Sequence, residues 1–221
     1  MLLAMDTSTR AVGVALYDGV RVLGESVWVS KNHHTIELAP SVAETLSRVG
    51  VDAKSLTAVG VAIGPGGFTG LRIGLALAKG LSLSRNLPLV GIPSLDVVAA
   101  SQAVIPQTKL AAVIEAGRRR LAVGWYHALE GKWLPDGELQ NLTLDEFLET
   151  IEVPAIVSGE LSGEARLRLG QMGVVLPSPA QSVRRPAVLA ELAWQRWKIG
   201  QIDNPETLSP IYLHHGEPIP G

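Results

Sequence analysis

The chain of 221 residues contains no cysteine, which excludes disulfide bonds and thiolate metal sites and fits a reducing compartment. Aromatic residues make up only 5% of the sequence, and the formal net charge at pH 7 is −2. A nearly balanced charge gives no general attraction to nucleic acid or to an anionic membrane. The composition therefore argues against a protein that binds either of them through bulk charge.

The sequence also has no apolar stretch of membrane-spanning length that is free of charges, prolines and glycine clusters. The segment from Met1 to Asp6 has no basic start and soon reaches a charge, which argues against a signal peptide. Hydrophobic residues nevertheless make up 47% of the chain, enough to form a core. We expect a cytoplasmic protein without membrane contact, folded as one large domain or two lobes.

The most informative motif is the glycine-rich run GPGGFTGLRIG, from Gly64 to Gly74, between an apolar segment and a helix-like one. Such a run indicates a sharp turn or a close approach of the backbone. One interpretation is an anion site at the start of the helix. The other is a partner helix packed closely against small residues, among them Gly70, Gly74 and Gly80. Neither a Walker A loop nor a dinucleotide fingerprint fits the spacing, so the pattern favours the second interpretation.

Apolar periodicity and turn signals predict a similar order of elements in two successive halves. In the first half we expect strands at 2–6, 11–17, 21–29, 56–63 and 87–90, and helices at 35–48, 71–83 and 95–101. In the second half we expect strands at 110–115, 121–128, 132–135, 155–158 and 174–176, and helices at 144–150, 161–169 and 186–199. Thr35 and Thr143 are expected to cap helices. The order predicts an α/β protein with lobes at 1–102 and 103–221, in which the last helix, 186–199, could pack back on the first lobe.

Five motifs carry a family resemblance: LAMDTST at 3–9, the glycine-rich run, AKGL at 78–81, GIPSL at 91–95 and PIYL at 210–213. Together they resemble the bacterial TsaB (YeaZ) family, most specifically in the first hundred residues. The resemblance implies an actin/Hsp70-like ATPase (ASKHA) fold of two lobes, each with a mixed sheet and helices. It also implies a non-catalytic subunit needed to form threonylcarbamoyladenosine (t6A) at position 37 of tRNAs that read A-starting codons.

The implied partners are the catalytic paralogue TsaD and the ATPase TsaE, and tRNA is contacted only indirectly. A helix that is apolar on every side, as 71–83 is, must be covered on every side, and one small lobe covers only part of it. The residues that we assign to the partner interface are Ile36, Ala39, Ala43, Leu46, Phe68, Leu71, Arg72, Leu75, Ala78 and Ser82. The same patch is expected to form a homodimer when TsaD is absent.

Two loops fall where actin-like ATPases bind phosphate. In the first loop, formed by Asp6, Thr7 and Ser8, the serine stands where a glycine would let the backbone approach a phosphate. We favour a hairpin turn in which the side chains of Asp6 and Thr7 bond to the backbone. In the second loop Glu115 and Gly117 depart from the family pattern, although they could mimic an acidic loop. We expect vestigial nucleotide loops and no cofactor, and nucleotide binding at a subunit interface stays open.

TsaD-type subunits carry a His-x-x-x-His metal pair where this chain has Ser94 to Val98, so we expect no metal site and no catalysis. The alternative is an ATP-dependent phosphotransferase or acyl-transfer enzyme that uses Asp6 and Glu115 with Mg²⁺. The only basic cluster, Arg118 to Arg120, is either a solvated turn or a contact to tRNA. Like Glu115 and Gly117, His214 departs from the family pattern, with no assigned meaning.

Overall fold

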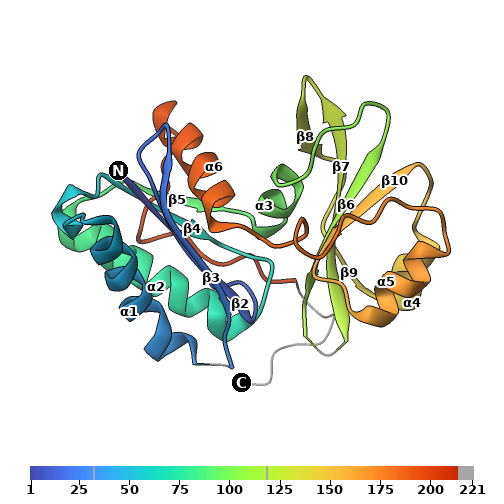
Figure 1. Cartoon of the computed structure of the whole chain (residues 1–221), viewed down its shortest axis with the longest axis horizontal. Helices are drawn as coiled ribbons and strands as arrows, with labels where there is room; N and C mark the ends of the chain where they lie inside the picture. Colours follow the sequence, from blue (N-terminus) through green and yellow to red (C-terminus); the bar gives the residue numbers. More distant parts are fainter. Residues whose placement is uncertain (32, 118, 214–221) are drawn as a thin grey trace.

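The computed structural model describes residues 1–31, 33–117 and 119–213, and contains two five-stranded sheets side by side (Figure 1). The first sheet has the order β3-β2-β1-β4-β5. Its strands are β1 (Leu2–Asp6), β2 (Ala11–Tyr17), β3 (Val22–Val29), β4 (Ala58–Ala62) and β5 (Leu89–Ile92). The first three strands form an antiparallel meander, and β4 and β5 join β1 in parallel.

The second sheet repeats the arrangement, with β6, β7 and β8 as the meander and β10 parallel to β6. Its strands are β6 (Lys109–Glu115), β7 (Arg120–Leu129), β8 (Lys132–Pro135), β9 (Gln140–Thr143) and β10 (Ala155–Gly159). In both sheets the first strand of the meander is therefore central and meets a parallel strand on its other side.

Helices cover both faces of the first sheet. On one face α1 (His34–Val49) and α2 (Phe68–Arg85) bury a core that includes Leu3, Met5 and Leu38. On the other face lies α6 (Pro186–Lys198), the last helix in the described part of the chain (Figure 1). The close approach of α6 depends on glycine, because a Cβ on Gly60 would lie 2.8 Å from the Cβ of Ala193.

Three shorter helices belong to the second sheet or to its junction with the first. Helix α3 (Ser94–Ala100) lies between the two sheets and packs on β6. Helices α4 (Leu144–Glu149) and α5 (Gly163–Gly170) cover the outer face, where Phe147 and Leu169 are fully buried. Among the described residues, no helix is both long and apolar enough to cross a membrane.

Most elements lie within a few residues of their predicted ranges, and three differ. Helix α1 begins at His34, so Thr35 lies within its first turn and does not cap it. Strand β9 was missed because its sequence, QNLT, is mostly polar and shows no apolar alternation. The segment predicted as a strand at 174–176 makes only one bridge, between Val175 and Ile156. The caps of α4 and α5 are as local signals indicate, with Thr143 in a capping box.

Candidate functional site

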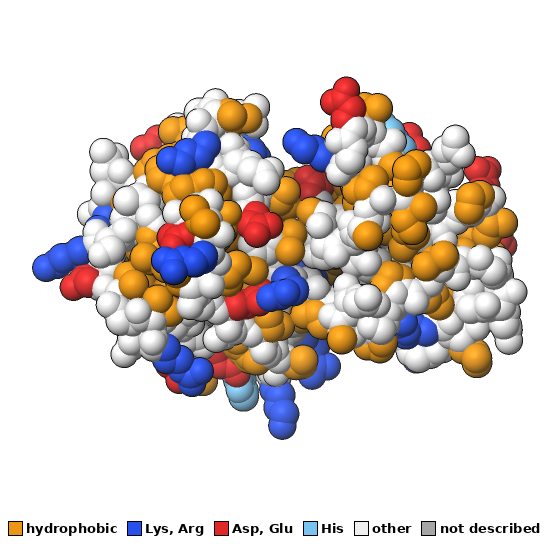
Figure 2. Space-filling view, turned by 45° about the horizontal axis from the view of Figure 1, so that its top comes forward, with side chains coloured by type: hydrophobic (Ala, Val, Ile, Leu, Met, Phe, Trp, Pro, Cys, Tyr) orange, Lys and Arg blue, Asp and Glu red, His pale blue; other side chains and the backbone are white. Residues whose placement is uncertain are grey.

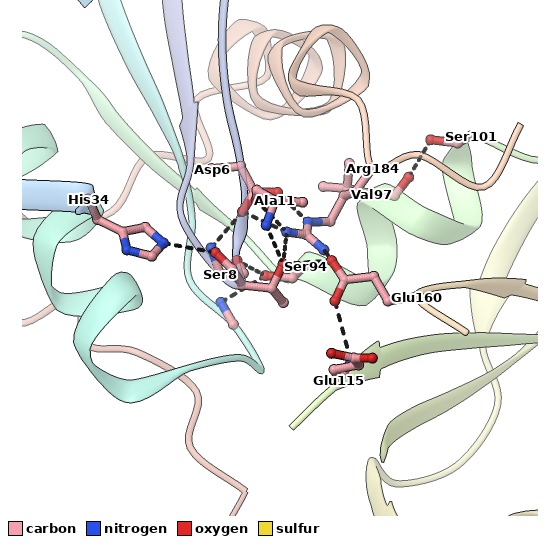
Figure 3. A network of polar contacts seen from close by, with 12 residues as sticks. Asp6, Ser8, Ala11, His34, Ser94, Val97, Ser101, Glu115, Glu160 and Arg184 are labelled. Atoms are coloured by element: carbon pink, nitrogen blue, oxygen red, sulfur yellow. Dashed lines mark hydrogen bonds and ion pairs between the residues drawn. The ribbon is translucent and has the colours of Figure 1, made fainter. Parts of the chain in front are cut away.

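A network of polar contacts joins the two sheets where β1 and β10 end (Figure 3). At its centre is Arg184, which lies just before α6 and has a side chain only 1% exposed. Its Nε donates to Oδ2 of Asp6 at 2.5 Å, and its Nη1 donates to Oε1 of Glu160 at 2.7 Å. Asp6 ends β1 in the first sheet, and Glu160 directly follows β10 in the second. One guanidinium therefore lies between carboxylates from the two sheets.

The third nitrogen of the Arg184 guanidinium, Nη2, is also used. It donates to Oγ1 of Thr9 at 3.1 Å and to the carbonyl of Ala11 at 3.2 Å. The Thr9 hydroxyl in turn donates to Oε1 of Glu160 at 2.6 Å. Burial opposes the charge of Arg184, but the adjacent carboxylates of Asp6 and Glu160 outweigh it and raise the guanidinium pKa above its ordinary value. The group is thus held as a buried cation that donates hydrogen bonds from all three of its nitrogens.

The first loop bonds to its own backbone and to the glycine-rich run. Oδ1 of Asp6 accepts from the Ser8 N–H at 2.8 Å, which is the backbone bond expected of this aspartate. The Thr7 side chain also bonds to the backbone, but outside the turn, because its hydroxyl donates to the Gly70 carbonyl in α2 at 2.7 Å. The hydroxyl oxygens of Ser8 and Ser94 lie 2.5 Å apart. The loop is therefore an internal packing element that holds α2 and α3 against β1.

The glycines of the glycine-rich run allow the close contact between this first loop and α2. A Cβ on Gly66 would come closer than 3.0 Å to the Ser8 carbonyl, and one on Gly70 equally close to that of Thr7. The Gly67 N–H, at the start of α2, donates to the Ser8 carbonyl at 2.6 Å and is not free for an anion. For Gly66 and Gly70 the partner-helix interpretation drawn from the sequence needs correction, because their closely packed neighbour belongs to the same chain. It is the β1–β2 turn of the same chain.

The second loop does not converge on Asp6. The Glu115 side chain is exposed, and only its backbone N–H reaches the network, donating to Oε2 of Glu160 at 3.4 Å. Gly117 has a positive φ of 76° and no atom within 4 Å of a Cβ placed on it. Arg118 lies outside the described residues. The carboxylate that approaches Asp6 is thus Glu160, through Arg184, and not Glu115.

These residues do not fit a magnesium–nucleotide complex. Both oxygens of Asp6 are bonded, one to Ser8 and the other to Arg184, so that neither faces a metal. The guanidinium of Arg184 occupies the space between Asp6 and Glu160. Glu115, the other carboxylate that the enzymatic alternative assigns to the ion, is exposed and lies apart from Asp6. In the described part of the chain, no three His, Asp or Glu side chains gather to hold a metal ion. His34, at the start of α1, is buried with its Nε2 3.0 Å from the Thr9 carbonyl.

Sequence reasoning missed Arg184 and Glu160, although one signal was available. Arg184 and Arg185 directly precede the N-terminus of α6, where the helix dipole disfavours cations. Two arginines at such a place need carboxylate partners, and the structure supplies Asp6 and Glu160 for the first and Glu25 for the second. Which carboxylates these are depends on the fold.

The residues assigned to a partner interface divide into two groups. Ile36, Ala39, Ala43, Phe68 and Arg72 are exposed on α1 and α2. Leu46, Leu71, Leu75, Ala78 and Ser82 are buried in the chain's own core. The second group cannot contact another chain in this structure, because all five side chains are buried within the chain itself, three of them (Leu46, Leu75 and Ala78) in the core against the first sheet. The sequence pattern located the buried stripe of α2, whereas its outer face carries Ala76, Gly80 and Leu83.

A separate cleft opens between α3, α6 and the β7–β8 hairpin, and Figure 2 shows the molecule hollowed between its two halves. Its cavity of about 370 Å³ is lined by residues that include Asp96, Tyr126, Trp133 and Gln195. The Tyr126 hydroxyl donates to Oδ1 of Asp96 at 2.7 Å. Burial raises the pKa of Asp96, although the hydrogen bond from Tyr126 opposes the rise. Burial and the neighbouring Asp96 raise the pKa of Tyr126.

Comparison with known proteins identifies relatives of this architecture. The family model described as "TsaD: tRNA N6-adenosine threonylcarbamoyltransferase" matches residues 22–148. The Bacillus subtilis "tRNA threonylcarbamoyladenosine biosynthesis protein TsaB" is 31% identical over 154 residues, which span 68% of this chain and 66% of that protein. The solved structure of YeaZ from Pseudomonas aeruginosa superposes with a TM-score of 0.77 and 26% identity, covering 96% of this chain and 99% of that one.

The fold extends to more distant proteins. A ROK hexokinase from Thermus thermophilus has a TM-score of 0.50 at 13% identity, covering 90% of this chain and 99% of that chain. At this identity the likeness concerns the fold alone. The predicted actin/Hsp70-like (ASKHA) class of fold, with mixed sheets and helices, is confirmed.

Proposed function

Because the chain belongs to the TsaB (YeaZ) family, we propose that it is a non-catalytic subunit required for t6A formation at position 37 of tRNAs that read A-starting codons. Its role is to dock on a TsaD-type catalytic paralogue and support its activity. The proposed lobes are 1–102 and 103–221. The first lobe carries the docking helices α1 and α2, and both lobes contribute side chains to the inter-sheet network. The enzymatic alternative loses its main support, because Asp6 is paired with Arg184 and Glu115 lies apart from it.

The observation that carries the proposal is the outer face of α1 and α2, which we call the docking face. It consists of Ile36, Ala39, Ala43, Phe68, Arg72, Ala76, Gly80 and Leu83. Ile36 is 71% exposed, Phe68 52% and Leu83 61%, an unusual amount of exposed apolar side chain on two adjacent helices. The same face carries the small residues Ala39, Ala43, Ala76 and Gly80, which let another helix approach closely. Such a face gains free energy when a second pair of helices covers it.

One end of the docking face is already organised by aromatic contacts. The ring of Phe68 lies 5.2 Å from that of Tyr212, which comes from the tail of the chain. The guanidinium of Arg72 stands 4.3 Å from the centre of the Phe68 ring. These contacts restrict the rotamers of Phe68 and Arg72 before a partner arrives, so less side-chain entropy is lost on binding. Aromatic and arginine residues of this kind are typical of binding hot spots.

The finer partner assignments are also proposals. We propose that a TsaE-type ATPase binds the assembled pair and that the chain forms a homodimer through the docking face when alone. We propose a cytoplasmic location, where the tRNA substrate is, and only indirect contact with tRNA. The net charge of −2 supports the last point, because it offers no general attraction to a polyanion.

The test mixes the purified chain with a TsaD-type partner and measures association by light scattering, with t6A formation on tRNA measured in parallel. Ile36→Glu and Phe68→Glu should abolish pairing and lower t6A formation while the fold persists. Phe68 is the first residue of α2, where an acidic side chain is favourable for the helix dipole. Leu167→Glu, on α5, is the matched control, since Leu167 is 68% exposed but lies away from the docking face.

The proposal requires the two docking-face variants to lose pairing and the Leu167 variant to keep it. Pairing that survives both substitutions would remove the docking face from consideration. Threonylcarbamoyl transfer by the chain alone, without the partner, would show that the subunit is catalytic.

A further inference from the structure

The contact between Arg184, Asp6 and Glu160 is the buried ionic link between the two sheets described above, and it is independent of the docking face. Arg184 belongs to the segment that returns from the second sheet to α6 on the first. Asp6 and Arg184 are 178 residues apart in the sequence, and Arg184 and Glu160 are 24 apart. Their positions in the chain therefore give no local reason for the three side chains to meet. The contact exists only when the two sheets have this mutual arrangement.

The two carboxylates around the guanidinium require a positive charge between them. Two carboxylates face one cation, and the Arg184 and Asp6 side chains are 1% and 2% exposed. Without the cation, Asp6 and Glu160 would repel each other in a place that water screens poorly. Their remaining donors, the Ser8 N–H for Asp6 and the Thr9 hydroxyl and Glu115 N–H for Glu160, carry no full charge.

The geometry of the guanidinium is used as well as its charge. Nε and Nη2 both point toward Asp6, at 2.5 and 3.5 Å, while Nη1 points toward Glu160. Nη2 also bonds the Thr9 hydroxyl and the Ala11 carbonyl, on the turn that follows β1 and at the start of β2. A planar fork with five donors satisfies this set of acceptors, whereas an ammonium with three donors would leave some of them unpaired.

We propose that Arg184 is an internal clasp, a cation supplied by the chain itself that lies between Asp6 and Glu160 and holds the two sheets in one arrangement without any bound ligand. The site between the sheets, which does not fit a magnesium–nucleotide complex, is on this view filled by the protein. The clasp keeps the relative position of the two halves fixed. The proposal does not depend on which partner the docking face binds.

The test uses the full chain and exploits its lack of cysteine. Val20→Cys in the turn between β2 and β3 and Leu167→Cys on α5 place one spin label on an exposed position beside each sheet, and an excess of unlabelled chain keeps a homodimer from adding distances between chains. Double electron–electron resonance then reports the distance between the halves in the parent, in Arg184→Ala and in Arg185→Ala. Arg185 is the matched control, because it is the neighbouring arginine and pairs with Glu25 while 56% of its own side chain stays exposed.

The parent and Arg185→Ala should give one narrow distance distribution. Arg184→Ala should give a broader distribution with a longer mean distance and a melting temperature lower by on the order of 10 °C. Millimolar methylguanidinium should restore the narrow distribution to Arg184→Ala, and methylammonium should restore it less well because it lacks the planar fork. Loss of stability alone would fit any buried arginine, so the distance and the selective rescue carry the test.

Equal distance distributions for the parent and Arg184→Ala would overturn the clasp. Equal rescue by the two cations would overturn the role of the guanidinium geometry. Should Arg184→Ala fail to fold, Glu160→Gln is the second variant, since it keeps the side-chain shape and removes one charge. The clasp predicts a broadened distribution for Glu160→Gln, and an unchanged one would contradict it.

Discussion

Two glycines of α2 should respond in opposite directions to the same substitution. Gly70 and Gly80 lie on one helix, ten residues apart, and alanine favours a helix interior over glycine by about 1 kcal/mol. Gly80 has no atom within 4 Å of a Cβ placed on it, so Gly80→Ala should realise the full gain. For a chain of this length, about 1 kcal/mol raises the melting temperature by about 2–4 °C.

Gly70→Ala should destabilise the protein in spite of the same helical preference. Its Cβ would come closer than 3.0 Å to the backbone carbonyl of Thr7, which is buried in the turn after β1. Overpacking of this kind costs about 1–3 kcal/mol. Displacement of the turn also weakens the 2.7 Å bond from the Thr7 hydroxyl to the Gly70 carbonyl, a loss of about 1 kcal/mol. After subtraction of the helical gain, the net loss is about 1–3 kcal/mol.

Urea unfolding of the parent and both variants, followed by circular dichroism at 222 nm, measures the two free energies of unfolding. The variants should differ by about 2–4 kcal/mol. A Gly70→Ala protein as stable as Gly80→Ala would refute the reasoning that Gly70 is required for the approach of α2 to Thr7. Gly80→Ala should also weaken pairing through the docking face, even though it stabilises the isolated chain, because its methyl group occupies space that a partner helix would use.

Three further predictions concern single positions. Leu71→Asp should prevent folding, because Leu71 is fully buried and truncation of such a leucine even to alanine costs about 2–5 kcal/mol; a folded Leu71→Asp protein by circular dichroism would contradict its placement in the core. Asp96→Asn should flatten the dependence of stability on pH. The pKa of Asp96 is raised in the folded state, so its contribution is complete below the ordinary aspartate pKa of about 3.9 and is lost as pH rises through the folded-state pKa. The urea midpoints of the parent and the variant at pH 4 and 7 measure this dependence. A midpoint that changes as much between the two pH values in the variant as in the parent would count against the prediction. Thr143→Ala should lower the free energy of unfolding by about 1 kcal/mol, because Thr143 accepts from the Glu146 N–H at 3.2 Å in a capping box; an unchanged urea midpoint would show that the cap is dispensable.

Local sequence signals located most of the helices and strands. The strands β1 and β2 follow from continuous apolar runs, the start of β3 from the Asp18-Gly19 turn, and β4 from another continuous apolar run. These signals act over a few residues, so they do not depend on how the rest of the chain packs. Strand β9 escaped them because its polar sequence becomes a strand only by pairing with β7.

The face of each helix that is buried was harder to infer. Helix α2 has apolar residues around most of its circumference, so periodicity could not separate the side toward the sheet from the side toward a partner. The sequence therefore led to Leu71 and Leu75 as interface residues, whereas contact with the sheet buries them. In the same way, the glycines indicated a close approach, but only the fold showed that Thr7 and Ser8 are what they approach.

By itself the sequence determined the order of elements, the two-part α/β architecture and the acidic residue at the end of β1, because these depend on periodicity and on motifs of a few residues. Tertiary structure alone decided that Asp6 is bonded to Arg184, that Glu160 and not Glu115 completes the network, and which residues of α1 and α2 remain exposed. The physical reason is the separation along the chain. An ionic contact between residues 178 positions apart is specified by the packing of both sheets and of α6, and no local pattern contains that information.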